Sequence, residues 1–193
     1  MNKRIRIKKS WFLLLLLLSC SDSVSDQYCC FNDPEYQSTI YEAQNSLKDL
    51  ASFPIGNVVS ANKIQSNNEF ISVLLNDFNS ITAENDMKMR NMFIGPNEYD
   101  FTDGDLIVSF AKENGIRVFG HALIWHSSIP DWLQNFSGTD LEFEEQVENY
   151  IKATVHHFSE QKMIIDGEEV SVVAGWDVVN EAFTSQAENA IFK

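Results

Sequence analysis

The feature that most constrains the fold is an alternation of strand-like and helix-like segments that begins near residue 53. Four apolar runs typical of buried strands lie at residues 55–60, 79–83, 117–120 and 172–179. Segments with helical apolar periodicity separate them, at residues 69–76, 103–114 and 140–158. Strands that alternate with helices indicate βα units and a parallel sheet, so the sequence predicts an α/β fold.

The ends of two predicted helices carry recognisable capping residues. Gly115 follows the second helix, where a glycine commonly ends a helix in the left-handed conformation. Thr139 and Glu142 fit a capping box at the start of the third. The apolar stripe expected on this third helix consists of Phe143, Val147, Tyr150, Ile151, Val155 and Phe158.

The strand ends favour a barrel over a doubly wound sheet. Residues 57–62 follow or overlap the first strand and contain no glycine, whereas a nucleotide-binding sheet needs a glycine-rich turn there. Polar residues follow several strands, as they do at the carboxyl-terminal face of a (β/α)8 TIM barrel. Such barrels typically have about 250 residues, and four units are recognisable here. We therefore expect the first four βα units of a barrel.

The charge balance excludes one class of ligand. The 193 residues include 14 basic and 28 acidic residues, a formal net charge of -14. Nucleic-acid binding depends on neutralisation of phosphates by Lys and Arg, so we expect no nucleic-acid partner. An uncharged carbohydrate would not be repelled by this surface.

The amino terminus resembles an export signal. Five basic residues precede Ser10, and six leucines at residues 13–18 form an apolar run too short to span a membrane. The sequence LLSC at residues 17–20 resembles a bacterial lipobox. We therefore expect residues 1–19 to be a lipoprotein-type signal peptide, with Cys20 lipidated and the protein anchored to a membrane at the cell surface or in the periplasm. An ordinary cleaved signal, giving a secreted protein, is the alternative.

Residues 20–46 are interpreted as a tether and an amino-terminal helix, and residues 47–193 as the domain that carries chemistry. The tether is rich in Ser and Asp. Cys29 and Cys30 are adjacent, and a disulfide between them would be strained, so their redox state stays open. Neither their spacing nor that of the histidines is typical of a zinc site, and no metal is expected.

Eight polar or aromatic residues follow the second, third and fourth predicted strands. They are Glu84, Asn85, Lys88, His121, Trp125, His126, Asn180 and Glu181. Short polar side chains bind sugar hydroxyls, and an aromatic face packs on the C–H side of a sugar ring. Glu181 has two interpretations, a solvated carboxylate at a strand end or a general acid.

Three motifs around these residues resemble the successive signatures of glycoside hydrolase family 10, the endo-β-1,4-xylanases. They are ITAENDMK at residues 81–88, GHALIWH at 120–126 and WDVVNEA at 176–182. Shorter matches accompany them: FPIG at residues 53–56, YDF at 99–101 and PDW at 130–132. The resemblance covers the chain from about Leu47 to Lys193.

The resemblance implies a retaining endo-1,4-β-xylanase that uses two carboxylates and needs neither metal nor cofactor. Glu181 would be the acid/base and Asn180 would hold the sugar 2-hydroxyl. Glu84, Asn85 and Lys88 would bind the xylose on the glycone side of the cleaved bond. The residues that would line the cleavage subsite are His121, Trp125 and His126.

The sequence departs from the family pattern at two positions and in its extent. Ser128 stands where a sugar-contacting glutamine is usual, and Phe119 where arginine is frequent. The nucleophilic glutamate of the family follows a later strand, and nothing before Lys193 matches it. We therefore expect a fragment that lacks the nucleophile half, inactive and poorly folded alone.

Two other functions stay open at this point. One is a surface module that binds xylan without cutting it. The other is a related barrel glycosidase that acts on β-glucan or mannan. The sequence gives no indication of the oligomeric state.

Overall fold

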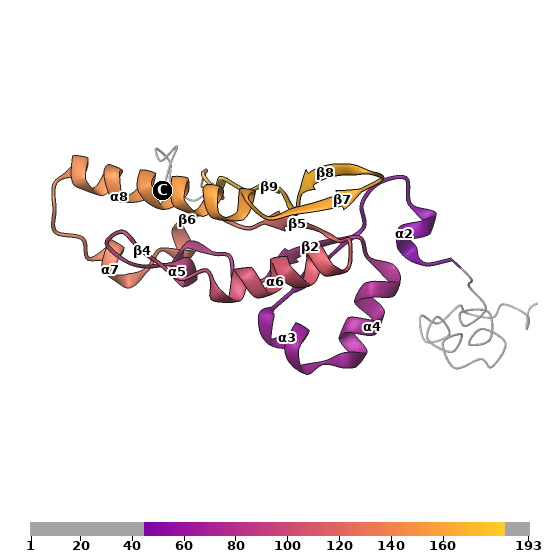
Figure 1. Cartoon of the computed structure of the whole chain (residues 1–193). Helices are drawn as coiled ribbons and strands as arrows, with labels where there is room; N and C mark the ends of the chain where they lie inside the picture. Colours follow the sequence, from indigo (N-terminus) through magenta and orange to yellow (C-terminus); the bar gives the residue numbers. More distant parts are fainter. Residues whose placement is uncertain (1–44, 184–193) are drawn as a thin grey trace, which may run out of the picture. The chain divides into compact units, whose positions relative to one another are not determined.

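The computed structural model describes residues 45–183 of the chain (Figure 1). The predicted signal peptide, the tether with Cys20, Cys29 and Cys30, and most of the predicted amino-terminal helix lie outside the described residues. The first described helix is the short α2 (Leu47–Leu50).

A four-stranded parallel sheet forms the centre of the described part. Its strands are β1 (Gly56–Val59), β2 (Ser80–Ala83), β5 (Arg117–Gly120) and β9 (Val173–Trp176). They pair in the order β1-β2-β5-β9, which is their order along the chain. The α/β fold with a parallel sheet is thus confirmed, and the strands adjoin in the way that consecutive barrel strands do.

The longer helices lie between consecutive strands, and local sequence fixes their ends. They are α3 (Ala61–Ser66), α4 (Asn68–Asp77), α6 (Thr102–Glu113) and α8 (Asp140–Ser159). Gly115, after α6, has a φ of +64°, a conformation that glycine adopts without steric cost. The capping box of Thr139 and Glu142 begins α8 as predicted.

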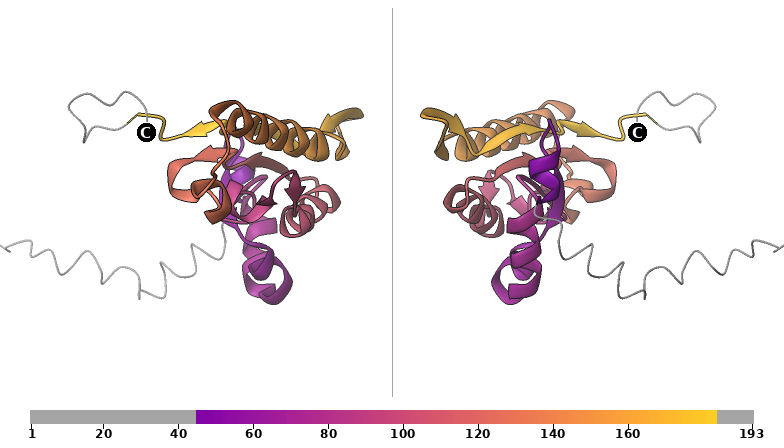
Figure 2. Two further views of the ribbon diagram at one scale, coloured as in Figure 1. Left: turned by 90° about the vertical axis from the view of Figure 1, so that its left-hand side faces the viewer. Right: turned by 90° about the vertical axis from the view of Figure 1, so that its right-hand side faces the viewer.

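Helices α6 and α8 lie side by side over one face of the sheet (Figures 1 and 2). The absence of a side chain at Gly104 permits the contact, because a Cβ there would come within 2.7 Å of the Phe158 ring. His157 Nε2 lies 2.6 Å from Asp105 Oδ1 and joins the two helices. Phe158 is fully buried and its ring lies 5.8 Å from that of Trp176 on β9.

The core lies between these helices and the sheet face that they cover. Val59, Ile81 and Val118 point into it from three strands and are each 0% exposed. Leu74 of α4 and Ile107 of α6 meet them from the helical layer, also at 0%. Apolar residues at alternate strand positions therefore build one compact core on the helix-covered side of the sheet.

The remaining helices and strands of the described part are short. They are α5 (Met89–Met92), β3 (Phe93–Gly95), β4 (Glu98–Tyr99), β6 (Ile124–Trp125), the 3-10 helix η3 (His126–Ser128), α7 (Asp131–Gln134), β7 (Lys162–Ile165), β8 (Glu168–Ser171) and β10 (Val179–Asn180). The β7–β8 hairpin was not predicted. Asp166 and Gly167, at φ +53° and +84°, form its turn. An Asp-Gly pair directly after an apolar run is a hairpin signal that could have revealed it.

Two sequence expectations were wrong in detail. The last predicted strand is not continuous, because β9 ends at Trp176 and β10 is a separate two-residue strand; Val178 and Val179 are 54% and 51% exposed. The predicted stripe of α8 is only partly buried: Tyr150 and Phe158 are fully buried, whereas Phe143 and Val155 are exposed. In residues 45–183, no helix combines the length and the apolar character needed to cross a bilayer.

Candidate active site

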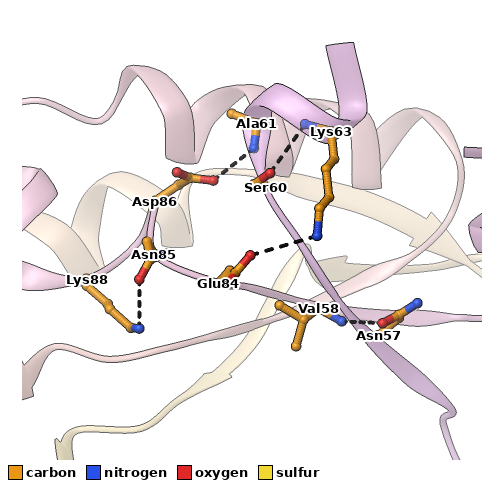
Figure 3. A network of polar contacts seen from close by, with 9 residues as sticks. All are labelled: Asn57, Val58, Ser60, Ala61, Lys63, Glu84, Asn85, Asp86 and Lys88. Atoms are coloured by element: carbon orange, nitrogen blue, oxygen red, sulfur yellow. Dashed lines mark hydrogen bonds and ion pairs between the residues drawn. The ribbon is translucent and has the colours of Figure 1, made fainter. Parts of the chain in front are cut away.

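The loop after β2 is tied to the start of the preceding βα unit (Figure 3). The backbone N–H of Glu84 donates to the carbonyl of Val59 over 2.8 Å and extends the β1–β2 ladder by one residue. Asp86 Oδ2 accepts a hydrogen bond of 2.8 Å from the N–H of Ala61, the first residue of α3. Lys63 Nζ, also on α3, lies 3.9 Å from Glu84 Oε2. These contacts hold the Glu84 loop at the carboxyl end of the sheet.

Lys88 connects this loop to the next part of the site. Its Nζ donates to Asn85 Oδ1 over 3.0 Å and lies 4.8 Å from the centre of the Trp125 ring. An ammonium group over an indole face is attracted by the ring quadrupole. The residues predicted after the second and third strands therefore lie in contact.

Trp125 in turn contacts Glu181. Strands β6 and β10 continue β5 and β9 as a short parallel ladder, in which Asn180 lies opposite Trp125. The Trp125 Nε1–H donates to Glu181 Oε2 over 2.8 Å, and His126 Nε2 lies 3.8 Å from the same oxygen. Glu181 has a φ of +53°, an uncommon conformation for a residue with a side chain, and this carboxylate remains 56% exposed.

His121 is held by a residue that the sequence did not single out. Its Nδ1 lies 2.8 Å from Asp177 Oδ2. The backbone of Asp177 also bridges the two segments, with its N–H donating to Gly120 and its carbonyl accepting from Leu123. A carboxylate on Nδ1 fixes the orientation and tautomer of the imidazole and directs Nε2 elsewhere. An acidic residue inside an apolar strand run was the signal that could have revealed this partner.

The structure thus connects six of the eight predicted residues through side-chain contacts at the carboxyl ends of the strands. Contacts through Trp125 link Asn85 and Lys88 to His121, His126 and Glu181. Glu84 precedes Asn85 in the chain, and its side chain instead pairs with Lys63. Asn180 is placed beside Trp125 by the ladder, but its side chain makes no hydrogen bond within the described residues. The group combines carboxylates, an amide, an ammonium, imidazoles and an indole on an exposed edge.

The two departures from the family pattern occupy different environments. Ser128 is 6% exposed in η3, so its hydroxyl lies beneath the surface. Phe119 lies on the sheet face away from the helices, next to Gly175 of β9. Among residues 45–183, no group of three or more His, Cys, Asp or Glu side chains is arranged to hold a metal ion.

Comparison with known proteins places this arrangement in a family. Residues 44–192 match glycosyl hydrolase family 10. The endo-1,4-beta-xylanase A of Cellvibrio japonicus is 38% identical over 151 residues, which are 75% of this chain and 22% of that protein. The beta-1,4-xylanase of Dictyoglomus thermophilum is 37% identical over 141 residues, 72% of this chain and 36% of that one.

The solved structures that resemble this chain are also named as xylanases. Native xylanase 10C from Cellvibrio japonicus has a TM-score of 0.67 and 32% identity, over 78% of this chain and 31% of that chain. Xylanase XynB from Paenibacillus barcinonensis has a TM-score of 0.63 and 30% identity, over 79% of this chain and 43% of that chain. The present chain thus spans less than half the length of each of these relatives. It belongs to glycosyl hydrolase family 10 and carries part of the family's α/β barrel.

Proposed function

We propose that this chain supplies the acid/base and the glycone-binding residues of a retaining endo-1,4-β-xylanase. The observation that carries the proposal is the pair of contacts on Trp125, with Lys88 over its ring and Glu181 on its Nε1. These contacts bring the ends of three strands to one exposed edge, where a polysaccharide chain has access. The proposal assigns roles to residues within this edge.

Glu181 acts as the general acid and then as the general base. Trp125 donates to Oε2, so the proton of the acid form sits on Oε1. From there it is transferred to the glycosidic oxygen as the bond to the leaving sugar breaks, and the resulting carboxylate then removes a proton from the attacking water. His126, 3.8 Å from Oε2, keeps that oxygen oriented.

The remaining residues bind and orient the sugar. Glu84, Asn85 and Lys88 bind hydroxyls of the xylose on the glycone side, and Asn180 holds the 2-hydroxyl, a contact that strengthens in the transition state. His121, held through Nδ1 by Asp177, presents Nε2 to a hydroxyl at the cleavage subsite. Trp125 offers its ring to the same subsite.

Xylan is the substrate best supported by the relatives. Proteins named as xylanases recur among the similar sequences and structures, and one similar solved structure is the E385A mutant of xylanase 10C in complex with xylopentaose. Hydrolysis with retention of the anomeric configuration requires a second carboxylate about 5–5.5 Å from the first. We assign that nucleophile to a later strand of the family barrel, so the activity belongs to a barrel in which this half is completed.

A hybrid barrel tests this function. The chain is joined to the carboxyl-terminal half of Paenibacillus barcinonensis XynB, and hydrolysis of xylan, β-glucan and mannan is compared. We expect cleavage of xylan with retained anomeric configuration, which proton NMR of the first product detects. A folded hybrid that binds xylo-oligosaccharides without cutting them would favour a binding module, and cleavage of glucan alone would favour the related glycosidase.

Export and anchoring form a separate proposal that rests on the leader sequence. Cys20 becomes the lipidated first residue of the mature protein, at the cell surface or in the periplasm. Metabolic labelling with palmitate in a bacterial host tests it. We expect label in the wild-type chain and none after Cys20→Ala; label that persists in the variant would contradict the assignment.

A further inference from the structure

The loops after β2 and β5 meet at a second place, besides the contact between Lys88 and Trp125. The first loop continues into α5 and β3, and the second into η3 and α7. Arg90 Nε donates to the carbonyl of Ile129 over 3.3 Å. Both loops follow parallel strands, so this second meeting also lies at the carboxyl ends of the sheet, where α5 and α7 are seen at the same end as β6 (Figure 1).

A groove of about 350 Å³ lies between the two loops at this point. Its lining combines apolar and charged side chains, which are Arg90, Phe93, Ile94, Pro130, Asp131 and Trp132. A hydrogen bond of 2.9 Å from Trp132 Nε1 to the carbonyl of Phe93 joins the two sides. Ile94 is 54% exposed and Trp132 is partly buried, so apolar surface is accessible in the groove. The volume lies within the range of small-molecule sites, about 300–1,000 Å³.

Two charged groups in this groove have no charged partner. Arg90 on α5 and Asp131 on α7 are both exposed, and neither forms an ion pair within residues 45–183. The carboxylate of Asp131 also accepts no hydrogen bond in this part of the chain. Arg90 uses one of its five N–H groups for the carbonyl of Ile129. The groove therefore offers free donors from one loop and free acceptors from the other.

We propose that this groove binds a neutral sugar unit of the same polysaccharide chain that the candidate active site holds. A hydroxyl both donates and accepts hydrogen bonds, so sugar hydroxyls match Arg90 and Asp131 together. The C–H surface of the sugar packs on Ile94 and Trp132. An anionic ligand fits less well, because the carboxylate of Asp131 lines the same groove and the chain has a formal net charge of -14.

The groove adjoins the residues assigned to the glycone side of the cleaved bond. Lys88 is the residue that precedes α5, and Arg90 lies two positions further along the chain. This part of the inference rests on the proposed function, which gives Lys88 its role. A chain long enough to extend past Lys88 gains contacts in the groove, whereas a disaccharide bound at Lys88 does not. Arg90 and Asp131 therefore determine a preference for longer chains.

Fluorine NMR of two tryptophans tests the groove and the candidate site separately. The 193-residue chain and the hybrid barrel with Glu181→Ala are labelled with 5-fluorotryptophan, and Trp125→Phe and Trp132→Phe assign the two signals. We expect xylohexaose to shift both signals. A shift of Trp125 alone would refute the groove and leave the proposed function standing. A shift of Trp132 alone would support sugar binding in the groove and contradict the glycone assignment, and no shift of either would refute both.

Matched variants test the preference for longer chains by calorimetric titration. Arg90→Ala should weaken the binding of xylohexaose at least about fivefold, because it removes charged hydrogen-bond donors, and should leave the binding of xylobiose unchanged. Arg90→Lys keeps a charged donor and should restore part of the loss. The control Lys112→Ala, at an exposed cation of α6, should change neither affinity.

Two results of these titrations would overturn the proposal. One is an equal loss for both oligosaccharides, or none for xylohexaose, after Arg90→Ala. The other is a dependence on Arg90 that is seen only with a uronate-substituted oligosaccharide, which would make the groove a site for an anion and not for a neutral sugar.

Discussion

The two faces of the central sheet carry similar apolar residues that differ in their exposure. On the helix-covered face, Ile81 and Val118 are 0% exposed and meet the rings and aliphatic chains of α6 and α8. On the other face, Val58 remains exposed, beside the exposed edge that carries Glu84 and Glu181. The comparison shows that the helix-covered face contains the buried apolar core, whereas the strand ends carry the exposed polar side chains of the candidate site. Substitutions on the helix-covered face should therefore lower the free energy of unfolding more than substitutions at the strand ends.

The largest expected effect is on the covered face. Phe158→Ala removes a fully buried ring between Gly104 and Trp176 and should lower the free energy of unfolding by about 3–5 kcal/mol. Urea titration followed by circular dichroism measures it. The control Val155→Ala, on the exposed side of the same helix, should change the free energy by less than about 0.5 kcal/mol. Similar losses from both variants would show that α8 does not cover the core as described.

Substitutions of two glycines compare the packing on the two sheet faces directly. A Cβ at Gly120 would lie 2.2 Å from the Trp176 ring under the helices, so Gly120→Ala should cost about 1–3 kcal/mol of unfolding free energy. A Cβ at Gly175 would lie 3.1 Å from the ring of Phe119, which is only partly buried on the sheet face away from the helices. Gly175→Ala should therefore cost clearly less, as judged by the same titration. The opposite order would mean that the face away from the helices is the more tightly packed one.

A smaller effect is expected at the start of α8. Thr139→Ala removes the capping hydroxyl and should cost about 1 kcal/mol. A hydrogen bond from the Thr139 backbone, and to a smaller extent one from its side chain, hold the pKa of Glu142 below its usual value. The stabilisation from Glu142 is therefore complete above the unfolded-state pKa and is lost as pH falls through the folded-state pKa. Urea titrations at neutral and acidic pH should show the cost of Thr139→Ala shrinking in acid. A cost that grows in acid would contradict the capping box.

The smallest effect is expected at the strand ends. Lys63 and Glu84 are 50% and 53% exposed and their charged atoms are 3.9 Å apart, so Lys63→Gln should change the free energy of unfolding by less than about 1 kcal/mol. Chemical denaturation again provides the measurement, with Lys152→Gln on the exposed surface of α8 as the control. A loss as large as that of Phe158→Ala would mean that the Glu84 loop is part of the structural core.

Much of the fold could be predicted because it depends on local patterns. Short apolar runs located the strands, and Gly115 and the capping box marked two helix ends where the structure has them. The division of the last strand was missed, because Asp177 interrupts the run through a contact with His121, 56 residues away. Pairing across that separation leaves no periodic signal in the sequence.

The candidate site followed from topology more than from any single motif. Parallel strands in chain order bring their carboxyl ends to one edge, so residues after β2, β5 and β9 had to lie near one another. The position of Trp125 at the centre of the group was not foreseeable, since it depends on the β6–β10 ladder. The assigned roles of these residues stay predictions.

The central claim is that Glu181 donates a proton to the leaving oxygen. Its most direct test compares two substrates in the hybrid barrel carrying Glu181→Ala, with the hybrid bearing Glu181 as reference. One substrate is xylan, whose leaving group needs protonation, and the other is a dinitrophenyl xylobioside, whose leaving group does not. The account predicts that the initial rate on xylan falls at least about a hundredfold, while the burst of released dinitrophenol is nearly unchanged. Equal losses on both substrates, or no loss on xylan, would contradict it.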